Sequence, residues 1–180
     1  MAAKNITQCK VAPRRLAVLL GLYSSFTWSQ DCNPAITATA PAKVFTLYKN
    51  GTALDTRSGL LWQRCSLGQR WDQDNKRCLG QALHQSWHKA SNAAAAQLVG
   101  WRLPSVNELS ALVESKCQSP AIDQTVFPDT PIDHFWTATP FVGQADYHWL
   151  VQFQFGENHV DKDSRGALLR LVKDLGSLKP

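Results

Sequence analysis

The sequence contains no uninterrupted apolar run of roughly 20 residues, the length that a membrane-spanning helix needs. The G-x-S-x-G, Walker A and H-E-x-x-H patterns are also absent, so the common motifs for serine hydrolysis, nucleotide binding and zinc proteolysis are missing. These absences argue against an integral membrane protein and against an enzyme. The composition, with 44% hydrophobic residues and 7 Trp among 180 residues, instead favours a packed globular core.

Acidic residues are missing from residues 1–30, and this gap explains the basic balance of the chain. Lys and Arg number 19 against 14 Asp and Glu, which gives a net charge of +5. Four of the basic residues precede the apolar segment: Lys4, Lys10, Arg14 and Arg15. Without them the balance is 15 against 14, or +1. The basic character belongs to the N-terminus, and we expect no nucleic-acid partner.

The apolar segment "LAVLLGLYSSFTWS" follows Arg15 and has the length of the hydrophobic region of a secretory signal peptide. Thr27 and Ser29 are small enough for the recognition positions before a cleavage site. The sequence therefore predicts a signal peptide at residues 1–29, cut near Ser29. The mature protein would be exported to the periplasm or the cell surface without a transmembrane segment; an uncleaved anchor is the alternative.

The cysteine count is uneven in the whole chain and even in the expected mature chain. Of 5 cysteines, Cys9 would leave with the signal peptide. An even number in an oxidising compartment predicts two disulfides, for which three pairings exist. Cys65 and Cys78 are separated by a polar, turn-like stretch, which favours joining them. Cys32 then pairs with Cys117.

Residues 43–65 read as two or three short strands. Asn50-Gly51 marks a hairpin turn, Ser58-Gly59 marks a second turn, and "LLWQ" follows as a buried strand. Residues 86–99 predict a helix capped by Ser86 and ended by Gly100. Its apolar face would contain Trp87, Ala90, Ala94 and Leu98.

The stretch "WRLPSVNEL" predicts the start of a second helix. Pro104 disfavours helix at the residue before it. Ser105 and Glu108 have the spacing of a capping box, in which each side chain binds the backbone N–H of the other residue. The apolar stripe that follows extends the predicted helix to about Lys116.

Trp101 and Arg102 precede this helix. Trp101 is expected in the core. The five fixed donors of an Arg side chain suit a role in bracing loops through carbonyl groups or an acid. We interpret the stretch as structural, with no part in a binding site.

The C-terminal part alternates between loops and strands. A short strand is expected at 134–139 and a closing strand at 167–173. Residues 147–156 alternate in polarity, which predicts a strand with one apolar face. That face would contain Tyr147, Trp149, Val151, Phe153 and Phe155. The order of strands, two helices, loops and strands predicts an α+β fold with antiparallel sheets.

Several segments together resemble the Lcl C-terminal domain family. They are "GTALDTRSGLLWQRC", "WRLPSVNELSALVE", "FWTATP" and "VQFQFG", in this order. The resemblance covers about residues 43–173. It implies a domain at 43–174, preceded by an extension at 30–42 that the second disulfide ties down, and followed by a tail at 175–180.

The resemblance also implies a fold related to C-type lectins and to the formylglycine-generating enzyme, with two helices packed on small antiparallel sheets. The domain that gives the family its name is implicated in adhesion and in binding sulfated polysaccharide. The formylglycine-generating relative uses two reactive cysteines, and carrying that activity over needs free thiols in the C-terminal part. The last cysteine here is Cys117, so that chemistry is not expected.

Two groups of residues contain side chains that bind metals in other proteins. Cys65, Cys78, His84 and His88 could form a zinc set, but the two cysteines lie much farther apart than in structural zinc sites. The acidic stretches at 72–75 and 161–163 lack the remainder of a calcium-binding loop. We therefore expect no metal and no cofactor.

Trp71 lies in the polar segment between Cys65 and Cys78, where an exposed ring could stack on a sugar or a partner protein. The predicted binding surface combines Trp71 with Arg70, Asp72, Asp74, Asn75, Lys76 and Arg77. Positive charge for a sulfated glycan would also come from Arg64. The alternative is that the ring folds back over a small core. Tyr147 and His148 are further candidates beside the loop that begins at Phe141.

The sequence thus favours an exported binding or adhesion module that recognises a glycan or a surface protein. A structural subunit of an envelope or surface assembly is the first alternative. A divergent enzyme is the second.

Overall fold

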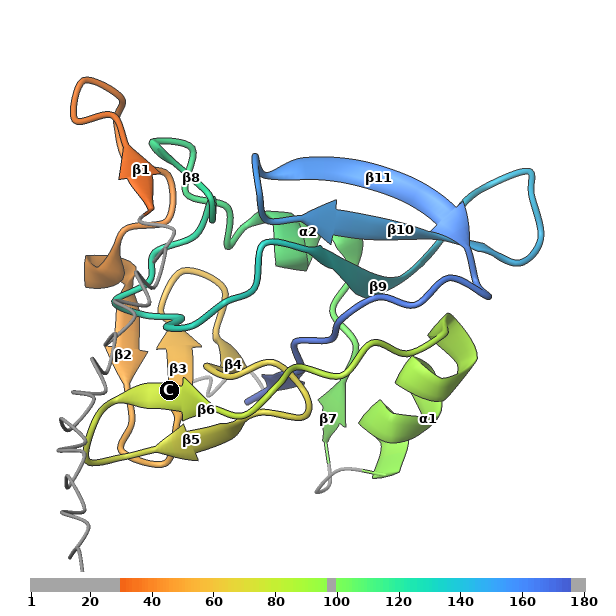
Figure 1. Cartoon of the computed structure of the whole chain (residues 1–180), viewed down its shortest axis with the longest axis horizontal. Helices are drawn as coiled ribbons and strands as arrows, with labels where there is room; N and C mark the ends of the chain where they lie inside the picture. The colour runs from red at the N-terminus through yellow and green to blue at the C-terminus, as the bar shows by residue number, and fades with distance from the viewer. Residues whose placement is uncertain (1–29, 97–99, 176–180) are drawn as a thin grey trace, which may run out of the picture.

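The computed structural model describes residues 30–96 and 100–175. The signal peptide predicted at 1–29, with Cys9, lies outside the described residues, as do Leu98 and the end of the tail. The fold is α+β: short antiparallel strands form four small sheets, and two helices pack beside them (Figure 1).

A five-stranded sheet joins the two ends of the domain. Its order is β2–β3–β4–β12–β7, with β2 at Phe45–Leu47, β3 at Thr52–Asp55, β4 at Leu60–Gln63, β12 at Val172–Asp174 and β7 at Trp101–Arg102. Both predicted turns and the predicted strand at 60–63 are confirmed. Gly51 has a φ of +81°, a conformation that glycine adopts without steric cost.

A three-stranded sheet lies above it in the view of Figure 1. The strands are β9 at His134–Pro140, β10 at Tyr147–Gln152 and β11 at Glu157–Lys162, in the order β11–β10–β9. Leu150 packs into one hydrophobic cluster and Val151 into another, so β10 is buried on both sides.

The predicted single apolar face of residues 147–156 is therefore wrong. Leu150 is fully buried, whereas Phe155 is 53% exposed in the turn after the strand. The reason is that two cores meet at this sheet, and a strand with a core on each side needs apolar residues on both faces.

Two two-stranded pieces accompany the disulfides. β1 (Asp31–Cys32) pairs with β8 (Cys117–Gln118), and β5 (Arg70–Asp72) pairs with β6 (Arg77–Leu79). A single 3₁₀ turn, η1, spans Ala42–Val44. Disulfides join Cys32 to Cys117 and Cys65 to Cys78, which confirms the predicted pairing.

The first helix, α1, spans Trp87–Ala96, with Ala90 and Ala94 buried as predicted. The second, α2, spans only Val106–Ser110, so its predicted extension to about Lys116 is wrong. The chain leaves the helix because Glu114 is fully buried and its carboxylate accepts the backbone N–H groups of Thr39 and Ala40. These hydrogen bonds to the N-terminal extension take the place of the two helical turns predicted between Ser110 and about Lys116.

The closing strand predicted at 167–173 is also shorter, since β12 begins at Val172. Residues 167–171 are buried and run between the two larger sheets. The Leu168 N–H donates to the carbonyl of His134 in β9, while the Leu171 carbonyl accepts from Gln63 in β4. A segment that divides its hydrogen bonds between two sheets forms no continuous ladder with either.

Candidate functional site

Trp71 lies in β5 and rests on the turn between β2 and β3. Its indole N–H donates to the Lys49 carbonyl at 2.9 Å, and the Arg64 guanidinium lies 4.1 Å from the ring centroid. A Cβ at Gly51 would approach the Trp71 Cγ to 2.4 Å, so only glycine allows the ring this position. The hydrogen bond, the cation–π contact and the close packing fix the orientation of the ring.

Two grooves border the fixed ring. The first, of about 540 Å³, includes Leu47, Tyr48, Lys49, Trp71 and Lys76. The second, of about 460 Å³, includes Asn50, Ser66, Gln69, Trp71 and Trp101. Tyr48 and Leu47 are among the exposed large apolar side chains. The indole thus folds back onto the chain, as the alternative interpretation held, and still lines two open grooves.

The acidic candidates beside Trp71 shape the β5–β6 turn. The Asp72 carboxylate accepts the side-chain N–H of Asn75 at 2.8 Å and the backbone N–H groups of Asp74 and Asn75. The hydrogen bond from the Asn75 side chain is the main reason that the Asp72 pKa is lowered. Asp74 and Asn75 are exposed. Asp72 has oxygen atoms committed to the turn, which limits its use for a ligand.

Two of the basic candidates, Arg77 and Arg64, are bound to other groups of the protein. Arg77 forms an ion pair with Asp129 at 3.2 Å, and the second oxygen of Asp129 accepts the Cys78 backbone N–H at 2.9 Å. Arg64 is only 4% exposed and donates to the carbonyls of Val126 and Thr125. Burial lowers the Arg64 pKa.

Arg64 therefore does not present surface charge, and the expectation that it would serve a glycan directly is wrong. Its guanidinium forms a cation–π contact with the Trp71 ring and donates hydrogen bonds to the backbone carbonyls of residues 125 and 126. Lys49, Arg70 and Lys76 are exposed, as is Arg77, whose guanidinium pairs with Asp129. We name the surface formed by Tyr48, Lys49, Arg70, Trp71 and Lys76 the Trp71 face.

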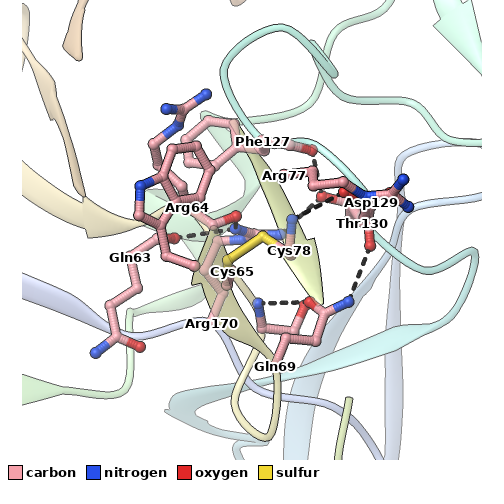
Figure 2. Close-up of a disulfide and its surroundings, with 12 residues drawn as sticks. Gln63, Arg64, Cys65, Gln69, Arg77, Cys78, Phe127, Asp129, Thr130 and Arg170 are labelled. Atoms are coloured by element: carbon pink, nitrogen blue, oxygen red, sulfur yellow. Dashed lines mark hydrogen bonds and ion pairs between the residues drawn. A yellow bond between two sulfur atoms is a disulfide. The ribbon is translucent and has the colours of Figure 1, made fainter. Parts of the chain in front are cut away.

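A fully buried arginine, Arg170, binds the backbone at Gln63 and Arg64 (Figure 2). Arg170 donates to the carbonyls of Gln63 and Arg64 and, at 2.8 Å, to the Thr130 hydroxyl. Its guanidinium lies 4.8 Å from the Phe127 ring centroid. Burial, with a smaller contribution from the charge of Arg64, lowers the Arg170 pKa to about 9, so the group stays charged at neutral pH.

Sequence reasoning missed Arg170. The only signal was a basic residue inside the apolar run "ALLRLVK", which was assigned to a strand. The Cys65–Cys78 disulfide and the hydrogen bond from the Cys78 N–H to the Asp129 carboxylate, both drawn in Figure 2, also hold the segment that carries Trp71.

A comparison with protein-family models matches residues 51–173 to the Lcl C-terminal domain. The chain belongs to the Lcl C-terminal domain family. A search of the curated proteins found no match. The family match begins at Gly51, the residue beneath the Trp71 ring, and includes the three-stranded sheet and most of the five-stranded sheet, whose strand β2 lies before the match.

In this Lcl C-terminal domain, most of the contacts predicted for the stretch "WRLPSVNEL" are present. Ser105 and Glu108 form both hydrogen bonds of the capping box, and Pro104 is buried. Arg102 forms ion pairs with Glu108 and with Asp174, each at 2.8 Å, which raise the Arg102 pKa and lower the pKa of both acids. Trp101 differs from expectation: it packs against the core from the edge strand β7 and is only half-buried.

Tyr147 and His148 occupy a different part of the Lcl C-terminal domain. They lie at the start of β10, near α1, whereas the β5–β6 hairpin lies at the opposite end of the molecule (Figure 1). Tyr147 is half-buried. His148 stacks on Trp87 with ring centroids 3.8 Å apart, and its Nδ1 lies 2.6 Å from an oxygen of Asp163. The two sets of predicted site residues therefore do not form one site.

The zinc set considered from the sequence cannot form, because the disulfide takes both cysteine thiols. His84 instead pairs with Asp133 at 2.8 Å. His88 lies near Asp146 and Asp163, a grouping that the sequence did not indicate because three separate segments supply it. Within residues 30–96 and 100–175, no helix is long and apolar enough to cross a membrane.

Proposed function

We propose that this chain is an exported binding module that attaches to a glycan on a surface through the Trp71 face. The observation that carries the proposal is the fixed indole of Trp71 between two open grooves, with exposed Tyr48 and two exposed lysines beside it. Stacking on a sugar ring needs a rigid aromatic side chain in an accessible position. Loops and turns that a rigid scaffold positions are common places for binding.

Charge favours a sulfated glycan among the glycans. Lys49 and Lys76 line the same groove as Trp71, and Arg70 precedes the ring in β5. The nearby Asp72 is occupied by hydrogen bonds within its own turn. An anionic sugar would thus meet aromatic and cationic groups together. Attraction between exposed charges weakens as salt rises, since screening acts within about 8 Å at physiological ionic strength.

Two further features support the wider proposal. Disulfides such as Cys32–Cys117 and Cys65–Cys78 persist in oxidising compartments, which supports export to the periplasm or the cell surface. Short antiparallel sheets, two helices and a C-terminal strand that pairs beside an N-terminal hairpin support the relationship to C-type lectins.

The test measures binding of a heparin-like polysaccharide and of its desulfated form. Trp71→Ala should weaken binding about tenfold, the effect of losing about 1.4 kcal/mol of contact. Trp71→Phe keeps an apolar ring and should lose less. Lys49→Ala with Lys76→Ala should reduce binding of the sulfated chain only.

Lys89→Ala with Lys43→Ala is the matched control, since both lysines are exposed and neither lines the groove. Circular dichroism checks that each variant is folded. Binding by Trp71→Ala and by the Lys49/Lys76 double variant equal to that of the parent protein would place the site elsewhere.

A second candidate function is a structural subunit of an envelope or surface assembly. Ile36 and Phe155 are 44% and 53% exposed and line one groove of about 370 Å³ beside the Cys32–Cys117 disulfide. Exposed apolar side chains that share a groove suit contact with another protein. If the parent protein binds no glycan, crosslinking to envelope proteins that Phe155→Ser abolishes would support this alternative.

A further inference from the structure

Three segments meet where α1 begins. His88 lies in the first turn of α1, Asp146 precedes β10, and Asp163 follows β11. One donor atom from each residue lies within 4.8 Å of the others. Among the described residues, these are three His, Cys, Asp or Glu side chains placed closely enough to hold one metal ion. We name this group the Asp163 cluster.

Backbone hydrogen bonds hold the three segments in place. The Trp87 N–H donates to the Asp163 carbonyl at 2.9 Å, and the Asp163 N–H donates to the Asp146 carbonyl at 2.8 Å. The residue before His88 and both acids are thus connected directly. The arrangement of the cluster does not depend on long, flexible side chains.

Asp163 has a buried carboxyl group with an unusual set of partners. Its side chain is 6% exposed, and its Oδ1 lies 2.6 Å from the His148 Nδ1. Its Oδ2 lies 3.9 Å from the His88 Nε2, and no described residue donates a hydrogen bond to that oxygen. A buried carboxylate is costly unless it is paired or binds a metal.

The other buried carboxylates of the described chain are satisfied differently. Both oxygens of Glu114 accept backbone N–H groups. Asp55 forms an ion pair with Arg57. Asp163 has only histidines as side-chain partners, and a second acid, Asp146, lies close to it. Two nearby carboxylates and a histidine leave a place for a cation.

We propose that His88, Asp146 and Asp163 bind one divalent cation of the zinc class, with water in the remaining positions. The gap of 3.9 Å between the His88 nitrogen and the Asp163 oxygen is too long for a hydrogen bond. It suits two ligands of one ion, since each zinc–ligand bond is about 2.0–2.2 Å. An imidazole ligand favours zinc over calcium or magnesium, which prefer oxygen ligands.

His148 acts as a positioning residue in this site. With the proton on Nδ1, it donates to the first oxygen of Asp163 and leaves the second oxygen for the cation. The stacking of His148 on Trp87 fixes the imidazole ring. Hydrogen bonds of this kind orient metal ligands in many sites. His88 and Asp146 are exposed, so a cation can reach the cluster from solvent.

The experiment uses the protein without a polyhistidine tag, stripped of metal with a chelator and then dialysed. Calorimetric titration with Zn²⁺ should show one ion bound per chain, and Ca²⁺ and Mg²⁺ should bind much more weakly. His88→Gln and Asp146→Asn should each weaken Zn²⁺ binding at least tenfold. Both residues are exposed, so these variants should fold.

His84→Gln is the matched control. His84 is another exposed histidine that pairs with an aspartate, and it is not in the cluster. Its Zn²⁺ affinity should equal that of the parent protein. The proposal is overturned if the parent protein binds no Zn²⁺, if Ca²⁺ binds more tightly than Zn²⁺, or if His88→Gln and Asp146→Asn bind Zn²⁺ as His84→Gln does. None of these outcomes depends on glycan binding.

Discussion

Arg102 lies in β7, which pairs with β12, and Arg170 lies two residues before β12; the two side chains are stabilised in opposite ways. Arg102 pairs with two acids at the surface, and its side chain is 38% exposed. Arg170 is fully buried and contacts carbonyls, a hydroxyl and aromatic rings, with no acid among its hydrogen-bond partners. The same side chain forms a surface ion-pair cluster in one place and a neutral-acceptor network in the other. Salt and acid should therefore affect only the first.

The largest effect is expected at Arg170. Arg170→Ala leaves three acceptors without their donor and opens a cavity, which should lower the free energy of unfolding by about 3–5 kcal/mol. Urea unfolding at low and high salt measures the loss, which should be the same in both. Arg170→Lys keeps the charge but not the fork of donors, and should lie between the parent protein and Arg170→Ala. A loss below about 1 kcal/mol would contradict this account of the buried network.

Arg102→Ala should cost less, about 1–2 kcal/mol, because its ion pairs are partly exposed. High salt weakens the pairs in the parent protein, so the difference between parent and variant should shrink as salt rises. The same urea experiment provides the comparison with Arg170. A salt-independent loss would mean that Arg102 acts mainly by packing.

The smallest expected effect is the change of the Arg102 contribution to stability at acidic pH. Arg102 lowers the pKa of Glu108 and Asp174 in the folded protein below their unfolded values, about 4.3 and 3.9. A lowered folded-state pKa contributes stability above the unfolded pKa, and this contribution is lost as pH falls through the folded-state pKa. The stability difference between the parent protein and Arg102→Ala should therefore narrow below about pH 4. Thermal unfolding between pH 6 and pH 3 tests this, and a difference that stays constant would separate Arg102 from these two acids.

Local patterns made Arg102 and its helix predictable from the sequence. A capping box has a fixed spacing, and a proline before it marks a boundary, so Ser105 and Glu108 were assigned correctly. The Cys65–Cys78 pairing and the Asn50-Gly51 turn were equally local inferences, and the Cys32–Cys117 pairing followed by elimination. The early end of α2 depends on contact between Glu114 and residues 39–40, which no local pattern shows.

Long-range contacts explain what the sequence did not reveal about the candidate sites. Two partners of Arg170, Gln63 and Arg64, lie more than 100 residues before it in the sequence. The sequence placed Trp71 correctly in a polar segment between two disulfide-bonded cysteines. The packing of its ring against Gly51 depends on the tertiary fold and was not predictable from the sequence. The Asp163 cluster combines residues from three segments, so no spacing in the sequence grouped His88 with Asp146 and Asp163.

The Cys32–Cys117 disulfide has a mechanical consequence. If the chain is pulled from a point before Cys32 and from β12, the tension crosses the bridge and continues through residues 117–174. Residues 33–116, about 300 Å of extended chain, then lie outside the path of the force and cannot lengthen until the bridge is reduced. The ring of Trp71 lies within that shielded loop, so a load on the ends of the domain would not stretch the segment that carries it.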